Sequence, residues 1–262
     1  MNSFEKLNKS YTTYKNTLCI GLDPDYHKLP AGFPQTPSGL YDFLIEIINA
    51  TQDLAVSYKI NFAFYEVFGS KGIEVIEKII PKISQDKFLI ADVKRSDIGN
   101  SSKFYAAAVY DNLSFDAATL NPLMGMDSLE EFFNYSDKLN FVLALTSNPG
   151  AKDFLYNMNF YPTLFREIIR KFTENFSEEN LGFVIGATKP EYAINARLLA
   201  PKYTFLIPGI GAQGGDLEQL RKANIMPALF NVSRDIIFPD NSGDYFEAVR
   251  NKALEYSQLL AI

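Results

Sequence analysis

The sequence predicts an α/β protein, a (β/α)8 TIM barrel that forms a single domain over residues 1–262. Two observations predict this fold. Eight short apolar runs alternate along the chain with eight longer segments of helical pattern, and the runs are largely apolar throughout, as is typical of parallel strands covered on both faces. Eight strand–helix repeats fit the roughly 250 residues of such a barrel, and no long stretch rich in Pro, Gly and Ser separates two domains.

Strands are predicted where short apolar runs rich in Val, Ile, Leu and Phe occur. Their ranges are 17–23, 57–63, 87–94, 115–120, 140–146, 182–187, 203–208 and 226–232. Helices are predicted between and after them, where several segments carry apolar residues at spacings of three and four. Their ranges are 38–52, 71–85, 102–111, 128–135, 162–176, 190–199, 216–223 and 244–259.

The composition argues against several kinds of partner and site. A net charge of −6 argues against nucleic acid or an anionic membrane as a partner, because both usually need a basic patch. The first residues lack the apolar core of a signal peptide, and nowhere do about 18 apolar residues run together, so we expect a cytoplasmic protein without a membrane span. Cys19 is the only cysteine and His27 the only histidine, which assigns acid–base chemistry to Lys and Asp and argues against a Cys-rich metal site.

Polar side chains gather where the predicted strands end. In a barrel of this class the active site lies at the carboxyl ends of the strands. Capping or turn formation explains one such residue, but five strands share the feature, so we predict an active site at this rim. The residues are Asp23; Lys59 and Asn61; Asp92 and Lys94; Thr146, Ser147 and Asn148; and Asn231, Ser233 and Arg234.

The most charged of these strand ends is the segment 88–100, F-L-I-A-D-V-K-R-S-D-I-G-N. Asp92 and Lys94 are two residues apart, so a strand presents both on one face, and Asp97 follows in the loop. An ion pair that only solvates the strand end is one explanation. Three alternating charges in six residues, followed by Gly99 and small polar residues, favour a catalytic role instead.

A glycine-rich segment follows the seventh predicted strand. It contains G-x-G-x-x-G at Gly209, Gly211 and Gly214. A dinucleotide site needs this motif after the first strand of a βαβ unit. After the seventh strand of a barrel, it is typical of a phosphate site, to which Arg234 would add a charge-assisted pair. The motif therefore favours a phosphate monoester over a nicotinamide cofactor.

Four blocks resemble the orotidine 5′-phosphate decarboxylase family, in particular its longer bacterial subgroup. They are D-V-K-R-S-D-I-G at 92–99, G-L-D-P at 21–24, L-T-S-N-P-G at 145–150 and P-G-I-G-A-Q-G-G at 208–215. The resemblance runs from about residue 10 to 255. Two positions depart from the subgroup: Ser96 stands where Gly is frequent and Ser101 where Thr is usual.

The resemblance implies an enzyme that converts orotidine 5′-phosphate to uridine 5′-phosphate in de novo pyrimidine biosynthesis, with no metal and no organic cofactor. Lys94 would donate a proton to C6 of the pyrimidine as carbon dioxide leaves. Lys59, Asp92 and Asp97 would complete a charge chain with it, Asp97 reaching in from the other subunit of a homodimer. An ammonium group aimed at C6 would stabilise the electron pair left there.

The resemblance also implies the residues that bind the substrate. Asp23 and Lys59 would contact the ribose hydroxyls, and Ser147 would hydrogen-bond the pyrimidine. Ser101 would follow Asp97 into the shared site. Gln213 and Arg234 would hold the phosphate.

Two other functions stay open. The D-x-K-x-x-D block at 92–97 also occurs in magnesium-dependent barrels that act on ketose phosphates as decarboxylases or aldolases, although T-S-N-P-G is not their fifth-strand pattern. A non-catalytic nucleotide-binding barrel is the other alternative. The intact set of four charges argues against it, because partly buried charges are costly to retain without a use.

Overall fold

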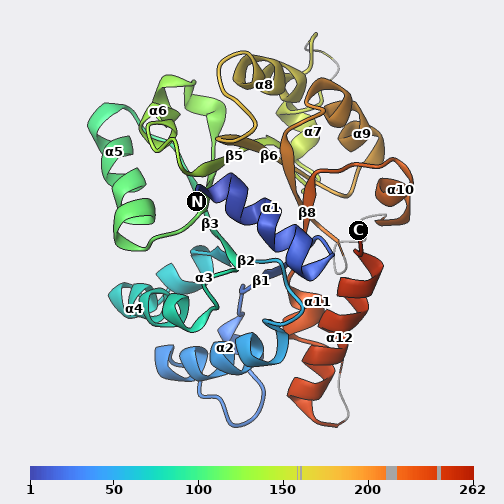
Figure 1. Cartoon of the computed structure of the whole chain (residues 1–262). Coiled ribbons are helices and arrows are strands. Elements are labelled where there is room, and N and C mark those ends of the chain that lie inside the picture. The colour runs from blue at the N-terminus through green and yellow to red at the C-terminus, as the bar shows by residue number, and fades with distance from the viewer. Residues whose placement is uncertain (158, 160, 211–216, 241–242) are drawn as a thin grey trace. The chain divides into compact units, whose positions relative to one another are not determined.

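The structure is a computed structural model that describes residues 1–157, 159, 161–210, 217–240 and 243–262. Its eight strands follow one another in chain order as a closed parallel barrel, with helices between them (Figure 1). The predicted fold class is confirmed. Over the described residues, no helix has the length and apolar character that a membrane crossing requires.

Each observed strand overlaps a predicted range. The strands are β1 Leu18–Gly21, β2 Ser57–Asn61, β3 Phe88–Arg95, β4 Ala117–Leu120, β5 Leu139–Leu145, β6 Leu181–Ile185, β7 Thr204–Pro208 and β8 Ala228–Val232. Nearly all of their residues are buried. Burial on both faces explains why these segments are apolar throughout and not alternating.

The helices of the described chain include all those predicted and several more. The α-helices are α1 Ser3–Tyr14, α2 Pro37–Thr51, α3 Ala63–Glu66, α4 Ser70–Ile79, α5 Gly99–Ala107, α6 Glu130–Phe133, α7 Ala151–Phe154, α8 Leu164–Thr173, α9 Pro190–Leu199, α10 Leu217–Lys222, α11 Arg234–Ile237 and α12 Tyr245–Leu259. Short turns of other helix types are η1 Tyr26–Lys28, η2 Ile80–Lys82, η3 Ala108–Asn112, η4 Pro122–Met124 and η5 Asp127–Leu129.

The chain divides into two compact units. The first unit comprises Met1–Phe4 and Lys94–Asn231, and the second comprises Glu5–Val93 and Val232–Ile262. That the whole chain behaves as a single domain stays a prediction.

In the second unit, β1, β2 and β3 pair in parallel, with Gly21 opposite Lys59 and Asn61 opposite Asp92. This register brings the polar ends of the three strands to one level.

Helices α2 and α12 of the second unit lie side by side (Figure 1). Helix α2 begins where the Thr36 side chain accepts a hydrogen bond from the Gly39 N–H and Pro37 occupies the first turn, both common start signals. Its Phe43 stacks on Phe238 at 5.6 Å between ring centroids. This aromatic contact packs α2 against the segment that follows β8.

The first unit contains β4 to β7 and most of β8, paired in parallel. Helix α8 of this unit is amphipathic. Phe165, Ile168, Ile169 and Phe172 of α8 are buried, and their spacing of three and four residues forms one apolar face. The same pattern predicted the helix from the sequence.

A buried lysine lies at the start of β3 in the second unit. Lys87 is fully buried, and its Nζ donates to the Ala55 carbonyl oxygen at 2.8 Å and lies 3.1 Å from the centroid of the Tyr14 ring. Burial lowers the pKa of Lys87 to about 8, although Asp86 and Asp53 act in the opposite direction. The folded chain therefore releases this proton at a lower pH than the unfolded chain does.

This lowered pKa predicts a pH dependence of stability. Between the folded value of about 8 and an unfolded value of about 10.4, the unfolded chain binds more protons, so the free energy of unfolding rises with pH. The excess of the wild-type free energy of unfolding over that of Lys87→Met should grow by about 1–2 kcal/mol from pH 7 to 10.5. Urea unfolding at a series of pH values measures it, with the exposed Lys78→Met as control. A difference that stays constant with pH would contradict the assignment.

Candidate active site

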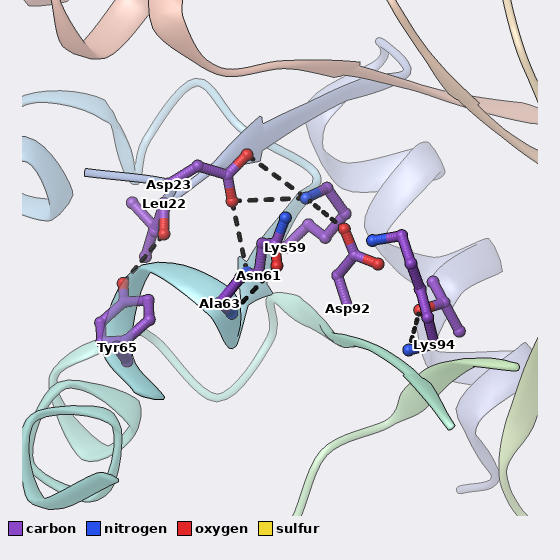
Figure 2. Close-up of polar contacts among 9 residues, drawn as sticks. Leu22, Asp23, Lys59, Asn61, Ala63, Tyr65, Asp92 and Lys94 are labelled. Atoms are coloured by element: carbon purple, nitrogen blue, oxygen red, sulfur yellow. Dashed lines mark hydrogen bonds and ion pairs between the residues drawn. The ribbon is translucent and has the colours of Figure 1, made fainter. Parts of the chain in front are cut away.

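Three charged side chains of the second unit meet at the ends of adjacent strands (Figure 2). Lys59 lies on β2, Asp92 lies on β3, and Asp23 lies two residues beyond the end of β1. The Lys59 Nζ is 3.0 Å from Asp92 Oδ2 and 3.4 Å from both carboxylate oxygens of Asp23. The structure thus brings together three of the residues that the sequence assigned to one site, and we call them the charge cluster.

Backbone contacts hold Asp23 in place. The Asn61 N–H donates to Asp23 Oδ1 at 3.3 Å, and the Tyr65 hydroxyl donates to the carbonyl oxygen of Leu22 at 2.9 Å (Figure 2). Gly72 of α4 allows a close approach to Tyr65, because a Cβ at position 72 would lie 1.8 Å from the Tyr65 carbonyl oxygen. Helices α3 and α4 therefore fix the strand end that carries Asp23.

The side chains of the charge cluster are almost completely shielded from solvent. Asp23, Lys59 and Asp92 are 8%, 3% and 9% exposed. Burial alone would lower the pKa of Lys59, but the neighbouring charges of Asp23 and Asp92 outweigh it and raise that pKa above its ordinary value. Lys59 is therefore an ammonium ion at neutral pH, and removing it would leave two carboxylates facing each other in a medium that solvates them poorly.

Lys94 follows Asp92 by two residues on β3 (Figure 2). Its side chain is exposed, unlike those of the charge cluster. Its backbone has a φ of 47°, in the left-handed region that residues other than glycine seldom adopt. Lys94 thus departs from the extended backbone that the sequence pattern predicted for it.

Three further predicted site residues lie in the first unit. Asp97 follows β3, its backbone N–H donates to the Ser128 carbonyl oxygen at 3.3 Å, and Ser101 is exposed on α5. Ser147 follows β5, and its carbonyl oxygen accepts from the Thr188 hydroxyl at 3.1 Å. Their position relative to the charge cluster stays a prediction.

The two residues predicted to hold a phosphate differ in what the structure describes. Arg234 is exposed and opens α11, directly after Ser233. Ser233 lies close to the end of β1, since a Cβ on Gly21 would lie 2.6 Å from the Ser233 Cβ. Arg234 therefore directly follows a residue that lies close to the carboxyl end of β1, the strand that leads to Asp23. Gln213 lies outside the described residues, as do Gly211 and Gly214 of the glycine motif.

Comparison with known proteins decides the family. The family model described as "Orotidine 5'-phosphate decarboxylase / HUMPS family" matches residues 16–246. The chain belongs to this family. An orotidine 5'-phosphate decarboxylase of Flavobacterium johnsoniae is 40% identical over 263 residues, covering 98% of this chain and 96% of that protein.

Solved structures agree with the orotidine 5'-phosphate decarboxylase family. The OMP decarboxylase of Leishmania donovani matches with a TM-score of 0.83 and 30% identity over 99% of both chains. The UMP synthase of Leishmania donovani matches with a TM-score of 0.86 and 32% identity over 99% of this chain, which spans 56% of that longer protein. The family recognised from the four sequence blocks, and the assignment of the chain as a decarboxylase enzyme, are confirmed.

Uncharged residues that contact the predicted site residues or the segments next to them within each unit were not predicted from the sequence. Tyr65 and Gly72 hold the strand end at Asp23, and Thr119 on β4 accepts a hydrogen bond from the Lys94 backbone. In the sequence, Thr119 is one polar residue within the apolar run A-A-T-L, and a β-branched residue there is what a strand favours. Among the described residues, no group of three or more His, Cys, Asp or Glu is arranged to hold a metal ion.

Proposed function

We propose that this chain decarboxylates orotidine 5′-phosphate to uridine 5′-phosphate in de novo pyrimidine biosynthesis, with Lys94 as the proton donor. The observation that carries the proposal is the buried Asp23–Lys59–Asp92 cluster at the ends of three strands, with Lys94 next on the same strand as Asp92. The identity of 40% to a decarboxylase over nearly the whole chain supports the choice of substrate.

The chemistry requires a proton and a place for an electron pair. The bond between C6 and the carboxylate breaks, carbon dioxide leaves, and the electron pair stays on C6. The Lys94 ammonium donates its proton to C6 and becomes an amine, which takes a proton from water before the next turnover. A fixed cation aimed at C6 lowers the barrier because it stabilises charge that exists only as the bond breaks.

The charge cluster supports the proton transfer by fixing the position of groups near Lys94 in the sequence and of the substrate. Lys59 holds Asp92 through the ion pair of 3.0 Å, so the carboxylate beside Lys94 on β3 has a fixed position. Asp23 and Lys59 also present groups that can bind ribose hydroxyls, which would place C6 relative to Lys94.

We propose further that the active enzyme is a homodimer in which Asp97 enters the partner's site. Support comes from apolar side chains of the first unit that are each more than half exposed: Ile98 and Phe104 follow Asp97 in the chain, and Leu123 and Met124 lie on η4. Large exposed apolar side chains in one region are typical of surfaces that bind another protein. A second copy covering them would bring Asp97 and the nearby Ser101 to the interface.

The proposed binding of the substrate phosphate by Arg234 and Gln213 can be tested by comparing orotidine 5′-phosphate with orotidine. Arg234→Ala should lower kcat/KM for orotidine 5′-phosphate by about 10²–10³-fold, because a charge-assisted partner of the phosphate is lost. Orotidine without its phosphate should show almost no penalty. Steady-state kinetics on both substrates measure this, and Arg234→Lys, which keeps the charge but loses the planar fork, should fall between the two. Equal penalties on both substrates would show that Arg234 does not bind the phosphate.

A further inference from the structure

The backbone of Lys94 has an unusual conformation, and its N–H donates to a side chain of β4. Its φ of 47° lies within β3, where neighbouring residues are extended. A left-handed conformation is unfavourable for a residue with a side chain and persists only where the surroundings hold it. Figure 2 marks a hydrogen bond at the backbone nitrogen of Lys94, and its acceptor is Thr119 Oγ1 at 3.0 Å.

Thr119 is a buried residue whose hydroxyl reaches the Lys94 backbone. It lies on β4 and is 1% exposed, so it has almost no surface to offer a ligand. Its own backbone is committed to the sheet, where it is opposite Phe141 of β5. The Lys94 N–H thus donates to the hydroxyl of a residue on β4. Because β4 also pairs with β5, the backbone that carries this hydroxyl has a fixed position.

We propose that Thr119 is a positioning residue for Lys94, which it holds in the left-handed conformation that aims the ammonium group. Without the hydroxyl, the Lys94 N–H loses its acceptor and the backbone is free to relax toward the extended conformation. The direction of the Cα–Cβ bond would change with it. A displacement of about 1 Å at a reacting group can cost about 100-fold in rate, so a buried hydroxyl can matter without touching the substrate.

The inference rests on the proposed role of Lys94, and kinetics can separate the two. Thr119→Val and Thr119→Ala, which remove the acceptor, should lower kcat by about 10–100-fold and change KM by less than about threefold. Thr119→Ser, which keeps the hydroxyl, should restore kcat to within about threefold of wild type. The matched control is Thr204→Val on β7, since Thr204 is also 1% exposed and its hydroxyl has no hydrogen-bond partner among the described residues. That variant should keep the wild-type kcat.

A structural readout completes the test. Amide hydrogen exchange at Lys94, followed by NMR, should become faster in Thr119→Val and stay slow in Thr119→Ser and Thr204→Val. If Thr119→Val keeps the wild-type kcat while Lys94→Ala is inactive, the positioning role is wrong and the proposed function stands. If Lys94→Ala itself keeps its activity, the proposed proton donor is wrong and Thr119 loses its role with it. A loss of kcat that Thr119→Ser does not restore would also overturn the inference.

Discussion

Lys94→Ala is expected to lower kcat for orotidine 5′-phosphate by about 10³–10⁴-fold, since the variant loses both the proton donor and the cation that stabilises charge at C6. The fold should survive, because the Lys94 side chain is exposed and its removal opens no cavity. The loss of substrate absorbance at high enzyme concentration measures the residual rate. Unfolding by urea checks that the free energy of unfolding is unchanged.

The matched control for this prediction is Lys78→Ala. Lys78 is exposed on α4 and pairs with Glu74 four residues earlier, at 3.7 Å, an interaction that contributes little. Its loss should leave kcat unchanged. A Lys94→Ala enzyme within about tenfold of wild-type kcat would contradict the proposed proton donor.

The second large effect is the recovery of activity from two inactive proteins. Lys94→Ala and Asp97→Ala homodimers should each be nearly inactive, because each change affects both sites. After subunit exchange in equal amounts, half of the dimers are mixed and each mixed dimer has one intact site, so about a quarter of all sites regain activity. Steady-state turnover before and after exchange measures the recovery.

A second mixture provides the control for this experiment. Lys59 and Lys94 are proposed to serve the same chain's site, so Lys59→Ala mixed with Lys94→Ala should recover nothing. If the mixture of Lys94→Ala with Asp97→Ala also stays inactive despite proven exchange, Asp97 does not cross the interface. Recovery in both mixtures would place Lys59 and Lys94 in different sites.

Much of the barrel could be predicted because its strands are buried on both faces. The eight apolar runs coincide with β1 to β8, and amphipathic helices such as α8 follow from their spacing. Helix α1 was missed. Its sequence S-F-E-K-L-N-K-S-Y-T-T-Y is rich in weak helix formers, and Leu7 and Tyr11 are its only buried apolar residues. Helices α3, α7 and α11 have four residues each, too few to show a period.

Some features of the candidate site could also be predicted from the sequence, and others could not. That Asp23, Lys59 and Asp92 lie close together was predictable, because the carboxyl ends of neighbouring parallel strands meet at one rim, which the register of β1, β2 and β3 bears out. Their roles at a site stay a prediction. The left-handed backbone of Lys94 was not predictable, since no glycine marks the position. The role of Thr119 depends on a contact between residues 25 apart in the chain, which no local pattern reveals.

The most direct test of the account is to identify the product in the presence of a chelator. Purified protein, dialysed extensively against EDTA, is incubated with orotidine 5′-phosphate in D2O and followed by proton NMR. We expect complete conversion to uridine 5′-phosphate carrying deuterium at C6, at the same rate with and without added magnesium, because the proposed proton donor is a lysine that exchanges with solvent. No conversion, or conversion that disappears after dialysis and returns with magnesium, would contradict the account, and the second result would favour a metal-dependent enzyme that acts on ketose phosphates.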